Sequence, residues 1–257
     1  MTWFLTEDRD VVRTITLNRP ERRNAIPPEG WPELGQAFLD FETSSQRVLV
    51  LTGAGGAFSS GADLDPERAD RNVVAARRRM KIVGDAASAL HRLSKPTLAV
   101  VDGVAAGAGM NLALGCDLVI ATPRARFSEI FVKRGLTVDF GGSWLLPRIV
   151  GLQRAKELAL TGRMVEAEEA RLLGLVLEVV EPERLAERIA ELTAALAAGA
   201  PVAQMFAKQS LNRAFQVSFA QALNDEGQSQ AICLTSDDAV EGVTAFLEKR
   251  PAHFTGR

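Results

Sequence analysis

Two glycine-rich turns are the first places where this sequence could do chemistry. They are GAGGAFSSGADL, residues 53–64, and GVAAGAGMNL, residues 103–112, and each follows an apolar segment and leads toward a helical one. Small residues let a ligand approach the main chain, and N–H groups at a helix start favour developing negative charge. Two such turns aimed at one oxygen would form an oxyanion hole. Without a ligand they would be tight, closely packed turns, and the residues alone leave both interpretations open.

A dinucleotide-binding site is the competing interpretation of glycine-rich turns between strands and helices. It requires the spacing G-x-G-x-x-G. After Gly53 and Gly55 the third glycine position holds Phe58, and after Gly107 and Gly109 it holds Leu112. The spacing therefore excludes a dinucleotide site at either turn.

Composition narrows the possible partners. The chain has 257 residues, of which 47% are hydrophobic and 24% charged, with a formal net charge of −2. This profile fits an α/β domain with an appendage, and it gives no electrostatic footprint for nucleic acid or an anionic membrane. The opening MTWFLTEDRD lacks the apolar run of a signal peptide, and charged residues interrupt every apolar stretch. We therefore expect a cytoplasmic protein with neither nucleic-acid nor membrane partners.

Cysteines and histidines are scarce. Cys116 and Cys233 could pair, but in a cytoplasmic protein we expect two reduced, buried thiols. The only histidines are His91 and His253, and there is no HxxxH or CxxC. We therefore expect neither a metal site nor a Ser-His-Asp triad.

The pattern along the chain indicates how these turns are positioned. Apolar segments at 11–18, 47–53, 97–103 and 117–122 predict strands, and a long amphipathic stretch at 68–94 predicts a helix. This rhythm favours parallel pairing with crossover connections. The basic run 77–79 within that helix predicts a solvated face, with Lys81 paired to Asp85, rather than a phosphate site.

Helical patterns dominate after residue 139. The exception is one short predicted strand at 175–181. From Pro201 to Arg250 the pattern is helical almost throughout, with a bend expected at Pro201 and a capping box formed by Asp238 and Glu241. We accordingly divide the chain into a core, 1–200, and a C-terminal helical region, 201–257.

Four motifs resemble one family. They are LNRPERRNAI (17–26), the turn at 53–64, VDGVAAGAG (101–109) and EGVTAFLEKR (241–250), in the order and spacing of the enoyl-CoA hydratase/isomerase (crotonase) superfamily. The resemblance covers nearly the whole chain. It implies an α/β fold made of a spiral of repeated ββα units, with a C-terminal helical region that forms trimers, often paired into hexamers. It also implies an acyl-CoA thioester substrate and no cofactor beyond the CoA moiety.

The resemblance also implies the binding site. The thioester oxygen would lie between the N–H groups of Ala62 and Ala108; the family often has Gly at the second position, but a main-chain donor does not depend on the side chain. Lys249 would reach the nucleotide bound by a neighbouring subunit. The substrate path implied by the family comprises Arg22, Arg23, Ala25, Gly61, Asp63, Leu64, Val104, Ala106, Gly107, Phe131, Leu136 and Lys249.

The acid/base positions depart from those of the family's hydratases, which have glutamates at the places of Asn111 and Phe131. Neither Asn nor Phe can transfer a proton. Asp139 matches the working carboxylate of several branches, including epoxyphenylacetyl-CoA isomerases and some acyl-CoA dehalogenases, although Val138 replaces their common Pro. Asp139 could also cap the following helix, Asn111 could be a satisfied polar group of the site wall, and we expect Glu129 to be structural.

These residues favour double-bond or ring isomerisation of an enoyl-CoA, with Asp139 as the proton carrier. One alternative is a hydratase with relocated acid/base groups. A dehalogenase would need Asp139 as nucleophile and a histidine beside it, for which His91 is the candidate. The alternative from another class is a catalytically silent acyl-CoA-binding homologue, against which Asp139 argues.

Overall fold

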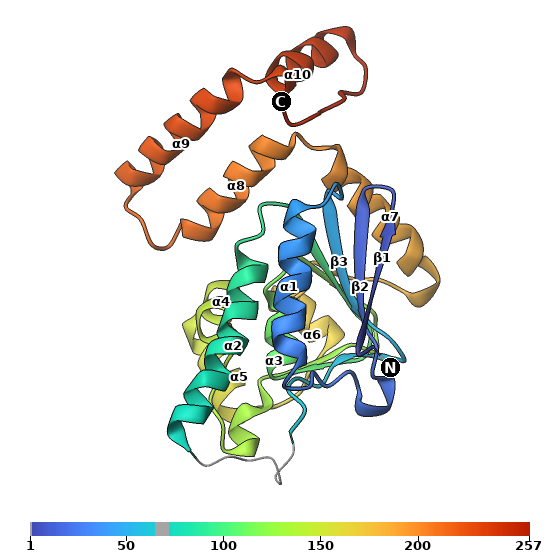
Figure 1. Cartoon of the computed structure of the whole chain (residues 1–257), viewed down its shortest axis with the longest axis vertical. Helices are drawn as coiled ribbons and strands as arrows, with labels where there is room; N and C mark the ends of the chain where they lie inside the picture. Colours follow the sequence, from blue (N-terminus) through green and yellow to red (C-terminus); the bar gives the residue numbers. More distant parts are fainter. Residues whose placement is uncertain (1, 65–71) are drawn as a thin grey trace.

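Strand pairs wind through the core as a spiral. The computed structural model describes residues 2–64 and 72–257 (Figure 1). Three successive pairs each give one strand to a large sheet and one to a small sheet. They are β3 (Val48–Gly53) with β4 (Ala57–Ser59), β5 (Thr97–Val101) with β6 (Val104–Ala106), and β7 (Leu118–Ala121) with β8 (Arg126–Ser128). This repetition confirms the predicted spiral.

The large sheet has six strands in the order β1-β2-β3-β5-β7-β10. Its outer members are β1 (Phe4–Arg9), β2 (Val12–Leu17) and β10 (Glu178–Val179), and only the β1–β2 pair is antiparallel. The small sheet has the order β4-β6-β8-β9, with β9 (Val165–Glu166) antiparallel to β8. The strands predicted at 11–18, 47–53, 97–103 and 117–122 are confirmed to within two residues, whereas the one at 175–181 shortens to two residues.

Both faces of the large sheet are covered, which explains its continuous apolar strands. On one face, Leu49 and Leu51 join a core with α1 (Gly30–Thr43), α2 (Val73–His91) and α3 (Ala108–Leu114). On the other face, Val50 packs with Ile189 of α7 (Pro182–Ala198). The helix predicted at 68–94 is therefore confirmed from Val73, where the Asn72 side chain accepts hydrogen bonds from the first turn; residues 68–71 lie outside the described residues.

Shorter helices complete the core around the small sheet. They are the 3₁₀ turns η1 (Pro20–Arg22) and η3 (Ile130–Arg134), followed by α4 (Gly142–Val150), α5 (Leu152–Thr161) and α6 (Ala167–Leu172). The predicted Lys81–Asp85 pair is present on the exposed face of α2, at 2.7 Å. Both cysteines are free; Cys116 is buried as predicted, whereas Cys233 is partly exposed.

Residues 201–257 form an arm that extends away from the core (Figure 1). This C-terminal arm consists of α8 (Pro201–Arg213), α9 (Phe219–Leu234) and α10 (Asp237–Glu248) and a tail. The predicted bend at Pro201 is confirmed, since α7 and α8 meet at 101°. Within the described residues no single helix is long and apolar enough to span a membrane, and the α7–α8 pair meets those criteria only when both helices are taken together.

The predicted capping box at α10 is wrong. Ser236 is the N-cap, and its hydroxyl accepts a hydrogen bond from the Ala239 N–H at 3.1 Å. Asp238 is buried in the first turn and accepts hydrogen bonds from the N–H groups of Thr255 (2.7 Å) and Gly256 (2.9 Å). The tail folds back on α10, and its N–H groups bind the Asp238 carboxylate that the sequence pattern predicted to cap the helix.

Candidate active site

The two glycine-rich turns lie against each other. A Cβ atom on Gly61 would be 2.8 Å from the Ala106 carbonyl oxygen and 3.3 Å from the Ala108 nitrogen. A Cβ atom on Gly109 would be 2.4 Å from the Ser59 carbonyl oxygen. Only glycine permits this approach without displacing main chain. The contact brings the N–H groups expected to form an oxyanion hole to neighbouring positions.

Within the part of the chain that the structure describes, neither of these N–H groups takes part in a regular helix or strand hydrogen bond. Ala108 is the first residue of α3, so its N–H has no partner within the helix. Ala62 forms a parallel bridge with Ile26, but that bridge uses the Gly61 carbonyl and the Asp63 N–H, each in a 2.8 Å hydrogen bond. The turn therefore leaves the Ala62 N–H for another acceptor.

Asn24 holds the first turn in place, although no pattern in the sequence singled it out. Its backbone is left-handed, with φ of 55°, and its buried amide donates to the carbonyls of Ala54 (2.8 Å) and Ala57 (2.7 Å). The Ser59 hydroxyl donates to the Asn24 carbonyl at 2.8 Å and accepts from the Gly61 N–H at 3.1 Å. The available signal was that Asn tolerates left-handed backbone better than most residues.

The predicted substrate-path residues gather around these turns, with one exception. Ser60 N–H donates to the Arg23 carbonyl at 2.9 Å, and Arg19 pairs with Asp63 at 2.9 Å, which joins η1 to the turn. Arg22, Arg23, Leu64 and Leu136 are exposed, Ala25, Gly61, Ala106, Gly107 and Phe131 are buried, and Val104 is intermediate.

Phe131 lies beside the second turn. A Cβ atom on Gly107, whose φ is 54°, would be 3.5 Å from the Phe131 ring. Lys249 is the exception among the predicted residues, because it ends α10 in the C-terminal arm (Figure 1). Its expected contact with a nucleotide on a neighbouring subunit stays a prediction.

Asn111 connects the second turn to the loop that carries Asp139. The Asn111 side chain is fully buried, and its amide nitrogen donates to the Asp139 carbonyl at 3.0 Å and to Glu129 Oε2 at 3.4 Å. A Cβ atom on Gly142 would lie 2.3 Å from the Asn111 amide nitrogen, so the start of α4 is packed directly on this amide. The structure thus brings Asn111, Glu129 and Asp139 together.

Two of these groups are carboxyls with raised pKa values. Burial raises the pKa of Asp139 to about 6. Burial and the Asp139 charge raise the pKa of Glu129 to about 7, against the opposing effect of the hydrogen bond from Asn111. Pairs of titratable groups with shifted pKa values are typical of acid/base sites.

Helix capping by the Asp139 side chain is not found. The N-cap of α4 is Gly141, with no side-chain hydrogen bond, and Asp139 Oδ1 is buried without a partner among the described residues. At the start of α4 it is the main-chain carbonyl of Asp139 that accepts a hydrogen bond, from the Gly142 N–H at 2.9 Å. The side chain of Asp139 is left without a structural hydrogen bond at that oxygen.

A cavity of about 460 Å³ lies beside the Asp139 loop, between α2 and α4. Its wall includes Phe140, which follows Asp139, and Trp144. The His91 ring also lines it and packs edge to face on Trp144, with 5.1 Å between ring centroids, and burial lowers the His91 pKa. Within the described part of the chain, no group of three or more His, Cys, Asp or Glu side chains is placed to hold a metal ion.

Comparison with known proteins agrees with this geometry. The enoyl-CoA hydratase/isomerase family matches residues 7–257. The 1,2-epoxyphenylacetyl-CoA isomerase of Escherichia coli is 39% identical over 261 residues, covering 100% of both chains. The short-chain-enoyl-CoA hydratase of Clostridium acetobutylicum is 35% identical over 248 residues, covering 96% of this chain and 95% of the relative.

Solved structures give the same result. The crystal structure of an enoyl-CoA hydratase/isomerase from Cupriavidus metallidurans CH34 has a TM-score of 0.92 and 36% identity, covering 100% of this chain and 97% of the other. The chain therefore belongs to the enoyl-CoA hydratase/isomerase family and has the crotonase fold. Because the relatives include both hydratases and an isomerase, the reaction has to be argued from the site.

Proposed function

We propose that the protein isomerises an enoyl-CoA thioester with Asp139 as its proton carrier. The observation that carries this proposal is Asp139 itself, a half-buried carboxyl with a pKa raised to about 6 and one oxygen without a donor among the described residues. Its main-chain carbonyl is hydrogen-bonded to Asn111 of the second glycine-rich turn. A base with a pKa near the working pH is suited to take a proton from carbon and to return it.

The proposed reaction moves one proton and one double bond. The Asp139 carboxylate removes a proton from the acyl carbon chain, and the resulting negative charge is delocalised to the thioester oxygen. The N–H groups of Ala62 and Ala108 stabilise that oxygen as an oxyanion hole. Asp139 then returns the proton to a different carbon, so the substrate and product differ only in the position of the double bond. For a ring substrate the same two groups would act on the rearranging ring.

Asn111, the other polar side chain beside Asp139, cannot act as a second proton carrier. Asn111 donates both of its described hydrogen bonds to acceptors within the protein, and Phe131 is apolar. Hydration of a double bond requires groups that hold water and transfer protons. Isomerisation therefore fits these residues better than hydration.

Hydration with relocated acid/base groups is the second candidate, because Glu129 gives the site a second carboxyl. Its side chain is fully buried, however, and it faces Asn111 rather than an open cleft. A catalytically silent acyl-CoA-binding role is disfavoured by the raised pKa and unpartnered oxygen of Asp139.

Incubation with a 3-enoyl-CoA tests the proposal, because isomerisation creates a conjugated thioester whose ultraviolet absorbance can be followed. Replacing Asp139 by Asn keeps the size of the side chain but removes its ability to accept a proton, so turnover should fall by ~10²–10⁴. Binding of the CoA ester should change little. Rapid hydration of crotonyl-CoA by the wild type, retained in Asp139→Asn, would contradict the assignment.

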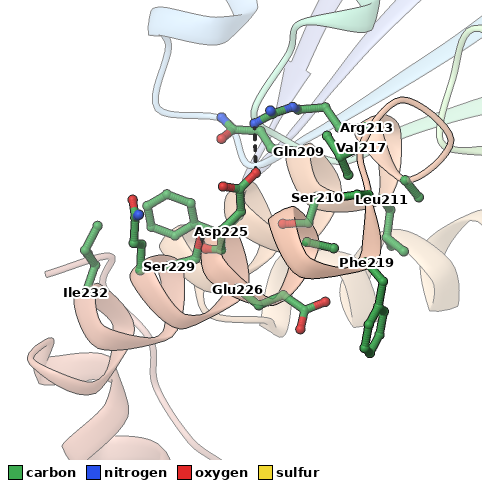
Figure 2. Close-up of a pocket in the computed structure, with 15 residues that line it drawn as sticks. Gln209, Ser210, Leu211, Arg213, Val217, Phe219, Asp225, Glu226, Ser229 and Ile232 are labelled. Atoms are coloured by element: carbon green, nitrogen blue, oxygen red, sulfur yellow. Dashed lines mark hydrogen bonds and ion pairs between the residues drawn. The ribbon is translucent and has the colours of Figure 1, made fainter.

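We further propose that the C-terminal arm joins copies of the chain, as a homotrimer or hexamer. Phe219 and Phe246 are 79% and 81% exposed, and neither α8 nor α9 contains a buried residue. A cavity of about 530 Å³ lies between these helices, and Arg213 and Asp225 at its edge form an ion pair of 3.4 Å. Figure 2 shows the side chains that line this cavity. Exposed apolar surface of this kind is typical of an interface. Light scattering showing a monomer at micromolar concentration would contradict this proposal.

A further inference from the structure

A closed polar cluster lies behind the Asp139 loop. Glu129 sits between β8 and η3, and Asn111 lies in α3; both side chains are fully buried. The Asn111 amide joins them, with hydrogen bonds to Glu129 Oε2 and to the main-chain carbonyl of Asp139. Because Glu129 has no access to solvent, it acts on the site only through its neighbours.

If Glu129 is ionised, this cluster contains more hydrogen-bond acceptors than donors. Asn111 donates both of its amide hydrogen bonds, and three buried oxygens are left without a donor in the described chain: Asn111 Oδ1, Glu129 Oε1 and Asp139 Oδ1. An ionised carboxylate adds only acceptors, whereas a neutral carboxylic acid supplies one O–H donor. Buried polar groups are normally hydrogen-bonded, so this cluster favours the protonated form of Glu129.

The cluster is also tightly packed, so a change in its geometry would displace Asp139. Gly142, at the start of α4, leaves no space for even a Cβ atom beside the Asn111 amide. The Gly142 N–H in turn donates to the Asp139 carbonyl, which also accepts from Asn111. A rotation of the Asn111 amide would therefore move the main chain that carries the proposed base.

We propose that Glu129 is a positioning residue that, as a neutral carboxylic acid, orients the Asn111 amide and thereby the main chain of Asp139. This inference rests on the proposed role of Asp139 in isomerisation. The Glu129 O–H supplies one donor, which can pair the protonated Glu129 oxygen with one of the other two unpaired oxygens, and ionisation of Glu129 removes that donor.

The surrounding groups favour a Glu129 that is mostly neutral below about pH 7. The groups that act on it are the Asn111 amide from α3 and the Asp139 carboxyl from the loop before α4, and burial together with the Asp139 charge raises the Glu129 pKa to about 7. Charged residues of η3 and the start of α5, which pack nearby, have exposed side chains: Lys133, Arg134, Arg154 and Lys156. Asp139 and Glu129 should then titrate as a pair, with Asp139 ionising first.

Two substitutions separate a neutral acid from a carboxylate. Glu129→Gln provides a permanently neutral group of the same shape. It should match the wild-type kcat near pH 6, where Glu129 is mostly neutral, and remove the loss of activity that the wild type shows as Glu129 ionises at higher pH. Glu129→Ala should lower kcat by about tenfold to a hundredfold with little change in KM, because the base is misplaced. Glu183→Gln, exposed in the first turn of α7, is the matched control for losing a carboxylate.

Two kinetic results would overturn the inference. If Glu129→Gln loses as much activity as Glu129→Ala, Glu129 works as a carboxylate. If both variants keep the wild-type kcat and pH profile, Glu129 does not position the base.

A measurement without substrate distinguishes failure of this inference from failure of the proposed function. The Glu129 pKa is raised from 4.5 to about 7 in the folded chain, so its contribution to stability is present below about pH 4.5 and is lost as the pH rises to about 7. The Tm should therefore decline over this range more steeply in the wild type than in Glu129→Gln. Equal declines would overturn the neutral-acid inference, whereas a wild type that leaves 3-enoyl-CoA unchanged would overturn the isomerase proposal.

Discussion

Phe38 of α1 and Phe246 of α10 both belong to amphipathic helices, yet the first is fully buried and the second is 81% exposed. The same contrast holds between the core and the C-terminal arm as a whole: α1 contains six buried residues, whereas α8 and α9 contain none. The core thus satisfies its apolar side chains within one chain, and it also contains the entire proposed acid/base cluster. The arm leaves its apolar side chains for another surface, so chemistry and assembly should respond to different substitutions.

The matched pair Phe38→Ala and Phe246→Ala tests this division most directly. Truncating the buried ring should lower the free energy of unfolding by about 3–5 kcal/mol, because it leaves a cavity in the core. Truncating the exposed ring should change the stability of the isolated protomer by less than about 0.5 kcal/mol but weaken assembly by about 2 kcal/mol or more. Denaturant unfolding and light scattering measure the two effects. Equal losses of protomer stability would contradict the division.

Ala108→Pro removes one proposed oxyanion donor in the core and should reduce turnover by ~10²–10³. Ala108 is the first residue of α3, a position where Pro is well tolerated, so circular dichroism should show an intact fold. Ala108→Gly keeps the N–H and serves as the control, with activity close to that of the wild type. Assembly should be unchanged in both. Full activity in a folded Ala108→Pro protein would place the thioester oxygen elsewhere.

The contact between the C-terminal arm and the core can be weakened without changing the active site or the exposed apolar side chains. Lys208 of α8 donates to Asp117 Oδ2 at 2.7 Å and to the Lys95 carbonyl at 2.9 Å, with its side chain only 12% exposed. Lys208→Met should cost about 1.5–3 kcal/mol and increase hydrogen exchange in α8. Lys81→Met breaks an exposed helix pair worth about 0.3–0.5 kcal/mol and is the control. Similar exchange in the two variants would show that Lys208 does not hold the arm to the core.

The pH dependence should appear in chemistry and not in assembly. Asp139 must be ionised to accept a proton, and its pKa is raised to about 6, so kcat should fall about tenfold between pH 7 and pH 5. Light scattering over the same range should show no change if the arm interface is apolar. A flat kcat between these pH values would contradict the role of Asp139.

The large sheet could be predicted because its strands carry long apolar runs, such as VLVLT at 48–52. The strands of the small sheet have only two or three residues each, too few for any hydrophobic period to appear, and none of them was predicted. β1 was missed because its sequence, FLTEDR, is mostly polar and exposed. At α10, local pattern favoured Asp238 as a cap, but a tertiary contact with the tail decided its role.

The site shows the same limit. The family resemblance predicted that the turns at 53–64 and 103–112 lie together, and the Gly61–Ala108 approach confirms it. The sequence did not indicate that Asn24 holds the first turn or that Glu129 faces Asn111, eighteen residues away in the chain. Such pairings depend on the relative placement of β8 and α3 in space. A local sequence pattern does not indicate that placement.

The exposed arm also bears on how the protein is made. Because neither α8 nor α9 contains a fully buried residue, the core can reach its folded form before the apolar side chains of the arm are covered by another surface. A newly synthesised protomer then carries phenylalanines such as Phe219 and Phe246 in contact with water until it meets another copy. Refolding from denaturant should consequently show a fast unimolecular phase followed by a slower one whose rate depends on protein concentration, and the second phase is where aggregation would compete.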